Sequence, residues 1–129
     1  MDTNRLKVMV LDDEPIVCKR LQPALEKLGY EVETFIHSEE AMRRIQETNY
    51  DIIVTDLKMK GIDGMQFLQE AKKRSPKTEV IVITGFATLE TARESFQKGV
   101  FDFIAKPFKL GEIQEVVNKA AAKIRGTAT

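Results

Sequence analysis

Short apolar runs recur along this chain, and each is followed by a turn and by a segment with helical periodicity. The runs predict five strands, over residues 6–11, 32–36, 52–55, 80–84 and the less apolar 101–105. Three of these runs are nearly continuous in Val, Ile and Leu, which is typical of strands buried on both faces. We therefore expect a sheet that is covered on both sides.

Apolar residues at steps of three and four predict a helix after each run. Ser38 and Thr88 are predicted helix N-caps, and Gly29, Gly99 and Gly126 are predicted to end helices. The periodic positions are Cys18, Leu21, Leu25 and Leu28; Ala41, Met42 and Ile45; Met65, Phe67, Leu68 and Ala71; Leu89, Ala92 and Phe96; and Leu110, Ile113, Val117, Ala120 and Ile124.

Five strands that alternate with five helices predict an α/β fold, a parallel sheet with helices on both faces, because parallel crossovers are long and right-handed. In such sheets, ligands bind beyond the carboxyl ends of the strands. The residues that follow each predicted strand are therefore the candidates for chemistry.

Composition narrows the classes of function. The 129 residues are 43% hydrophobic and 31% charged, a balance typical of one soluble domain, and 20 basic residues cancel 20 acidic ones. This balance gives no reason to expect direct binding to nucleic acid or to a membrane surface. Cys18 and His37 are the only cysteine and histidine, which excludes an internal disulfide and makes a histidine-rich metal site a poor fit. With no signal peptide or membrane span in the sequence, we expect a cytoplasmic protein.

Acidic residues follow two of the predicted strands. Asp12 and Asp13 end the first, with Glu14 and Pro15 placed to begin a helix, and Asp56 ends the third. Taken separately, these acids could simply cap helices or turns. Together, Asp12, Asp13 and Asp56 form a pocket of three carboxylates, whose hard oxygen ligands suit Mg²⁺.

The fourth and fifth strands add a hydroxyl and a cation. Thr84 could serve only as a strand former, but its hydroxyl can also donate to an anion. Lys106 supplies a positive charge that can reach the same edge, and the following Pro107 permits a cis peptide bond that would aim the lysine inward.

Acid, acid, hydroxyl and lysine thus end strands one, three, four and five. In this respect the chain resembles the response-regulator receiver domains of bacterial two-component systems. The matching motifs are VLDDEP (10–15), TDLKMKGIDG (55–64), VITG (82–85) and DFIAKPF (102–108), and the likeness covers about residues 7–124. The segments 84–92 and 101–113 look most like receivers attached to AAA+ transcription activators.

The resemblance implies a flavodoxin-like (βα)5 sandwich with strand order 2-1-3-4-5. It also implies that Asp56 accepts a phosphoryl group from a sensor histidine kinase or a phosphotransfer protein. Asp12, Asp13, Asp56 and the backbone carbonyl of Lys58 would hold Mg²⁺. Thr84 and Lys106 would bind the phosphoryl oxygens.

Phosphorylation would draw Thr84 inward and let Phe103 change rotamer, which alters the surface of the fourth helix, fifth strand and fifth helix. Lys58 and Phe86 occupy the two positions that modulate phosphoryl lifetime in such domains. Lys60 stands where the family usually has proline, so the turn after Asp56 is expected to be looser.

The likeness implies a signalling phosphoacceptor that catalyses only its own phosphorylation and slow dephosphorylation. We expect one domain over residues 1–129, with no effector domain within the sequence, so the chain is either a stand-alone receiver or part of a longer protein. The output partner or effector is unknown, and a phosphorylation-dependent homodimer is among the expected assemblies.

Three rival functions stay open at this point. A flavin mononucleotide carrier would need a phosphate-binding loop where this chain has Asp12, Asp13 and Glu14, which repel phosphate in the absence of a metal. An aspartyl-phosphate hydrolase typically has its nucleophile and a second acid two residues apart after the first strand, a pattern that Asp12 and Glu14 match poorly. An interaction module that has lost phosphorylation would not need the full set of reacting groups.

Overall fold

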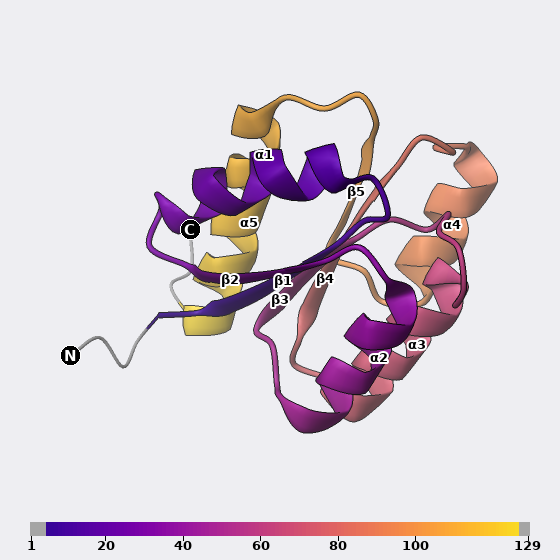
Figure 1. The fold of residues 1–129 in the computed structure, drawn as a ribbon, viewed down its shortest axis with the longest axis horizontal. Helices are drawn as coiled ribbons and strands as arrows, with labels where there is room; N and C mark the ends of the chain where they lie inside the picture. The colour runs from indigo at the N-terminus through magenta and orange to yellow at the C-terminus, as the bar shows by residue number, and fades with distance from the viewer. Residues whose placement is uncertain (1–4, 127–129) are drawn as a thin grey trace.

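The computed structural model describes residues 5–126, in which five strands alternate with five helices (Figure 1). The ends of the predicted domain, 1–4 and 127–129, lie outside the described residues. The elements are β1 (Lys7–Leu11), α1 (Pro15–Glu26), β2 (Glu31–Phe35), α2 (Ser38–Glu47), β3 (Ile52–Thr55), α3 (Gly64–Arg74), β4 (Glu79–Thr84), α4 (Leu89–Gln97), β5 (Asp102–Ala105) and α5 (Leu110–Arg125). The predicted strands agree with these bounds to within one residue.

All five strands are parallel, and their order in the sheet is β2-β1-β3-β4-β5. The predicted order is therefore confirmed. In β1, Val8 pairs with Val32 on one side and with Ile52 on the other, which makes β1 an interior strand. Because the strands run the same way, Asp12, Asp56, Thr84 and Lys106 follow their ends at one edge of the sheet.

Helices cover both faces of the sheet, as the continuous apolar runs predict. Helices α1 and α5 lie on one face and α2, α3 and α4 on the other (Figure 1). Two apolar clusters fill the layers, one built around Leu21, Leu25 and Ile113 and the other around Phe67 and Leu68. Every residue of β3 and β4 is buried, and so is Cys18.

Two predicted helix ends are confirmed and one is corrected. Thr88 caps α4 in a reciprocal capping box with Thr91, and Gly126 ends α5 in the left-handed conformation, both as predicted. The prediction that Ser38 is an N-cap is wrong. His37 occupies that position, and the Ser38 hydroxyl instead accepts from the Ile62 amide at 2.8 Å and donates to the Lys60 carbonyl at 3.0 Å.

Helix α4 packs differently from its sequence pattern. Ser95 is its one buried residue, whereas Leu89 and Phe96 are 75% and 50% exposed. Two of the three apolar positions with helical spacing, Leu89 and Phe96, are therefore exposed, as is Phe86 in the preceding loop. Burial of a serine removes little apolar surface from water, so it offsets little of the conformational entropy lost when the helix is ordered. Helix α4 is therefore held less firmly than a helix with an apolar core face.

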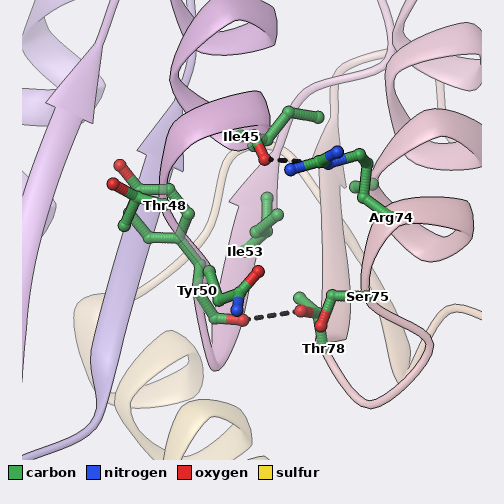
Figure 2. Close-up of a pocket in the computed structure, with 9 residues that line it drawn as sticks. Ile45, Thr48, Tyr50, Ile53, Arg74, Ser75 and Thr78 are labelled. Atoms are coloured by element: carbon green, nitrogen blue, oxygen red, sulfur yellow. Dashed lines mark hydrogen bonds between the residues drawn. The ribbon is translucent and has the colours of Figure 1, made fainter.

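A small cleft lies at the amino ends of the strands, away from the acidic residues (Figure 2). Arg74 of α3 donates to the Ile45 carbonyl of α2 at 3.3 Å, and the Thr78 hydroxyl donates to the Tyr50 carbonyl at 2.6 Å. These bonds satisfy backbone carbonyls at the end of α2 and before β3. The polar groups of this cleft thus have a structural role, and the reactive groups gather at the opposite end of the sheet.

No helix in the region 5–126 combines the length and the apolar character that a bilayer crossing requires.

Candidate functional site

Three carboxylates meet where β1 and β3 end. One oxygen from each of Asp12, Asp13 and Asp56 lies within 4.8 Å of the others. Asp12 is fully buried, Asp56 is 4% exposed, and Asp13 is half-buried. The expected three-carboxylate pocket is thus present, and it is open to solvent on the side of Asp13.

Backbone amides and a lysine hold these carboxylates. The Oδ1 atoms of Asp12 and Asp56 accept from the amides of Glu14 and Lys58, at 2.9 and 3.1 Å. The Lys106 ammonium lies 2.7 Å from Asp56 Oδ2 and 2.8 Å from Asp12 Oδ2. The Asp12 contact is an ion pair outside hydrogen-bond geometry, so this buried oxygen has a charge partner but accepts no hydrogen bond.

Burial and charge act in opposite directions on the two groups at the centre. Burial raises the pKa of Asp12, although the Lys106 ammonium and the Glu14 amide partly offset that effect. For Lys106, burial alone would lower the pKa, but its contacts with Asp12, Asp56 and Glu14 outweigh burial and raise it. Lys106 therefore remains a cation throughout the physiological range.

The loop after β3 is held more firmly than the sequence suggested. The Lys60 amide donates to Asp13 Oδ2 at 3.3 Å, a bond that a proline at this position could not make. The Lys60 carbonyl accepts a hydrogen bond from the Ser38 hydroxyl. Gly64 closes the loop, and a Cβ there would lie only 2.4 Å from Leu57 Cα. The expectation of a looser turn is therefore not met by these contacts.

The remaining predicted residues lie in the loop after β3, at the end of β4, in the loop that follows β4, and in β5. Thr84 is fully buried at the end of β4, and its hydroxyl accepts from the Phe86 amide at 3.0 Å. Phe103 of β5 is half-buried against the apolar cluster shared with α2 and α3. The Lys58 ammonium lies 5.5 Å from the centre of the Phe86 ring, and both residues line the cleft over Asp56.

One residue of the site was missed by sequence reasoning. Glu14, interpreted as the beginning of a helix, directs its Oε1 to within 2.6 Å of Lys106 Nζ. It occupies the N-cap position of α1 but makes no side-chain capping bond. Its place directly after two acids and before a proline indicated a helix start, and only the fold brings Lys106 within its reach.

Comparison with known proteins decides the family. The family model described as "Response regulator receiver domain" matches residues 8–118, most of the chain. The chain belongs to the response-regulator receiver family. Receivers are phosphoacceptor signalling modules rather than enzymes with turnover, which also resolves the flavin-carrier and hydrolase alternatives in favour of a receiver.

Individual relatives and solved structures also support membership of the receiver family. The transcriptional regulatory protein ZraR of Salmonella typhimurium is 31% identical over 127 residues, covering 98% of this chain and 29% of that protein. A receiver structure from Clostridium thermocellum is 31% identical with a TM-score of 0.86, covering 95% of this chain and 99% of that one. The beryllofluoride-activated NtrC4 receiver dimer is 34% identical with a TM-score of 0.86, covering 92% and 98%. The receiver spans less than a third of the length of the curated relatives it matches.

The acidic site also fits the divalent cation that receivers use. Asp12, Asp13 and Asp56 supply only oxygen ligands, and the buried Asp12 Oδ2 accepts no hydrogen bond that a cation would have to displace. Hard oxygen ligands with open positions favour Mg²⁺ over softer metals. The donor set is therefore typical of a receiver Mg²⁺ site.

Proposed function

We propose that Asp56 is the phosphoacceptor, and that it receives the phosphoryl group from a phosphohistidine of a sensor histidine kinase or phosphotransfer protein. The observation that carries this proposal is the position of Asp56 Oδ2, 2.7 Å from the Lys106 ammonium and inside the carboxylate cluster. In the transfer, an oxygen of Asp56 bonds to phosphorus, the phosphorus–nitrogen bond breaks, and the released imidazole takes up a proton.

Mg²⁺ is the proposed cofactor, held by Asp12, Asp13, Asp56 and the backbone carbonyl of Lys58. When bound, it would neutralise charge on the phosphoryl oxygens. Lys106 would neutralise a further oxygen, and the Thr84 hydroxyl would donate to another. Fixed charges and donors of this kind supply most of what phosphoryl transfer requires from a protein.

Mass spectrometry tests the acceptor. Protein incubated with acetyl phosphate and Mg²⁺ should gain the mass of one phosphoryl group, because acetyl phosphate supplies the group and acetate leaves. Asp56→Asn lacks the nucleophilic oxygen, and a chelator removes the cation, so both should abolish the added mass. Labelling of Asp56→Asn to the wild-type extent would contradict the assignment, and no labelling of wild type would revive an interaction module that does not use phosphate.

The proposed output is a change in the surface of α4, β5 and α5. A phosphoryl group carries about −1.5 to −2 charges near neutral pH and would attract the Thr84 hydroxyl. Thr84 now accepts from the Phe86 amide, so its movement would alter the loop that leads into α4. The space released beside Thr84 would admit Phe103, which changes the exposed face of β5.

This surface would control an effector domain or a separate partner, and a second copy of the chain is the partner we propose first. The exposed apolar side chains Phe86, Leu89 and Phe96 lie on or next to α4. The NtrC4 receiver, with 34% identity, forms a dimer when activated. Contact with nucleic acid would then fall to the effector, and the receiver itself would remain in the cytoplasm as a single domain.

A further inference from the structure

The Lys106 ammonium is divided among three carboxylates. Its Nζ lies 2.6 Å from Glu14 Oε1, 2.7 Å from Asp56 Oδ2 and 2.8 Å from Asp12 Oδ2. The contacts with Glu14 and Asp56 are hydrogen bonds, and the contact with Asp12 is an ion pair outside hydrogen-bond geometry. A phosphoryl oxygen on Asp56 would therefore compete with three carboxylates for Lys106, and it would bind the ammonium more tightly if one of them gave way.

Glu14 is the carboxylate best placed to give way. Asp12 is fully buried, and loss of Lys106 would leave it charged and without compensation. Asp56 is the residue that becomes esterified. The Glu14 side chain is 58% exposed, so water can replace the lysine as its partner at little cost.

We propose that Glu14 is a positioning residue that competes with the phosphoryl group for Lys106 and thereby holds the switch in its resting state. The inference rests on the proposed role of Asp56. The side chain of Glu14 makes no capping bond to α1, which leaves the ion pair with Lys106 as its described interaction. Its negative charge also repels a phosphoryl dianion on Asp56.

The isosteric substitution Glu14→Gln tests the competition. It removes the charge but keeps the size, so Lys106 is released toward the phosphoryl oxygens. At saturating Mg²⁺, we expect beryllofluoride, a phosphoryl mimic, to bind about three- to fivefold more tightly, the ratio for loss of one partly exposed ion pair. Labelling by acetyl phosphate should accelerate by a similar factor. Both quantities are measurable, by NMR titration and by intact-mass kinetics.

The affinity for Mg²⁺ alone supplies a readout that a merely structural role would not reproduce. Without Glu14, Lys106 pairs more closely with Asp12 and Asp56 and competes with the cation. Mg²⁺ should therefore bind more weakly to Glu14→Gln while beryllofluoride binds more tightly. General damage to the site would weaken both ligands. Glu14→Asp keeps the charge on a shorter side chain and should give intermediate values for both.

Glu26→Gln is the matched control, since it removes one exposed carboxylate from the opposite end of the same helix, where Gln22 is its partner. It should behave as wild type in all three measurements. Unchanged or weaker beryllofluoride binding in Glu14→Gln would overturn the inference, as would an equal gain in Glu26→Gln. A wild-type protein that accepts neither phosphate nor beryllofluoride would instead refute the proposed function of Asp56.

Discussion

At the scale of single residues, we propose that Lys58 and Phe86 control how water would reach a phosphoryl group on Asp56. They contact each other over the cleft, with the ammonium 5.5 Å from the ring centre, and they belong to the loops after β3 and β4. Hydrolysis needs a water in line with the phosphorus–oxygen bond, and an apolar ring over the cleft obstructs that approach without orienting the water.

We therefore expect slow self-dephosphorylation, which either of two substitutions should accelerate. Phe86→Ala opens the approach, and Lys58→Asn supplies an amide that can orient water. Each should raise the rate about tenfold, equivalent to about 1.4 kcal/mol of barrier. The measurement is loss of phosphate after removal of the donor at constant Mg²⁺. Decay of both variants at the wild-type rate would refute steric control by this pair.

A second residue-scale prediction concerns stability in acid. Burial raises the pKa of Glu33, but hydrogen bonds from Tyr50 and Arg44 outweigh it and lower the pKa below its ordinary value of 4.5. A lowered folded-state pKa gives stability that is present above the unfolded-state pKa and is lost as pH falls through the folded-state value.

Glu33→Gln should accordingly lower the free energy of unfolding by about 1 kcal/mol at neutral pH, with the deficit shrinking as pH falls below the ordinary pKa of 4.5. Urea unfolding between about pH 7 and pH 3 measures it. Tyr50→Phe removes the hydroxyl donor and should reduce the same acid-dependent component, whereas Glu26→Gln should leave it intact. A deficit that is constant with pH would contradict this account.

At the scale of elements, α4 and the loop before it form the movable part of the proposed relay. The helix buries only Ser95, and its capping residue Thr91 also donates to the Phe86 carbonyl at 2.9 Å. Thr84 is tied to Phe86 through the amide of the same residue. A shift of Thr84 would thus be passed to the first turn of α4 through two hydrogen bonds.

Thr84→Ala should separate phosphorylation from this relay. The variant keeps Asp56 and Lys106 and should still accept phosphate, but it loses the hydroxyl that distinguishes the two states. Backbone NMR shifts on phosphorylation should become smaller across residues 87–109 and stay near wild type around Asp12 and Asp56. Wild-type shifts across 87–109 would exclude Thr84 as the relay.

The elements were largely predictable, and the exceptions have physical reasons. Short apolar runs located the five strands and period-3.6 apolar patterns located the five helices, because burial dictates the runs and most of the helical stripes. The apolar stripe of α4 did not indicate which side of the helix is buried, since the sequence pattern is the same whether the stripe faces a core or a partner. Serine is a common N-cap residue, but the Ser38 hydroxyl forms hydrogen bonds with a loop more than twenty residues away in the chain. Capping rules, which use only neighbouring residues, do not predict such a contact.

The candidate site divides in the same way. The proximity of Asp12, Asp13, Asp56 and Lys106 was predictable because the carboxyl ends of parallel strands meet at one edge. The roles of these residues and of Thr84 stay predictions. Glu14 was missed as a partner of Lys106 because 92 residues separate the two in the chain. The contact between Lys58 and Phe86 was also unforeseen, although both had been singled out, because it depends on how two loops approach each other.

At the scale of the whole molecule, activation is expected to change its oligomeric state. The exposed side chains of Phe86, Leu89 and Phe96 gather apolar surface on one side of the domain, and monomeric proteins rarely leave large patches of this kind unused. The matched NtrC4 receiver is a dimer in its beryllofluoride-activated form. We expect this chain to form a dimer in its activated form as well.

Sedimentation velocity with and without beryllofluoride and Mg²⁺ tests the prediction. The protein should sediment as a monomer at rest and as a dimer when activated. Leu89→Glu places a charge in the apolar patch and should weaken the dimer at least tenfold, whereas Ile16→Glu, at an exposed apolar residue of α1 on the other side of the sheet, should not. A monomer in both states would assign the patch to a different partner.

The pairing of Lys106 with carboxylates has a consequence for selectivity among anions. An unpaired ammonium group at an open cleft would attract free phosphate and other small anions. Here the group already donates to Glu14 and Asp56 and pairs with Asp12, so a small anion competes with three carboxylates and also meets the charge of Asp13. We therefore expect free phosphate to bind weakly at this cleft, whereas a phosphoryl group attached to Asp56 would be held there by its covalent bond.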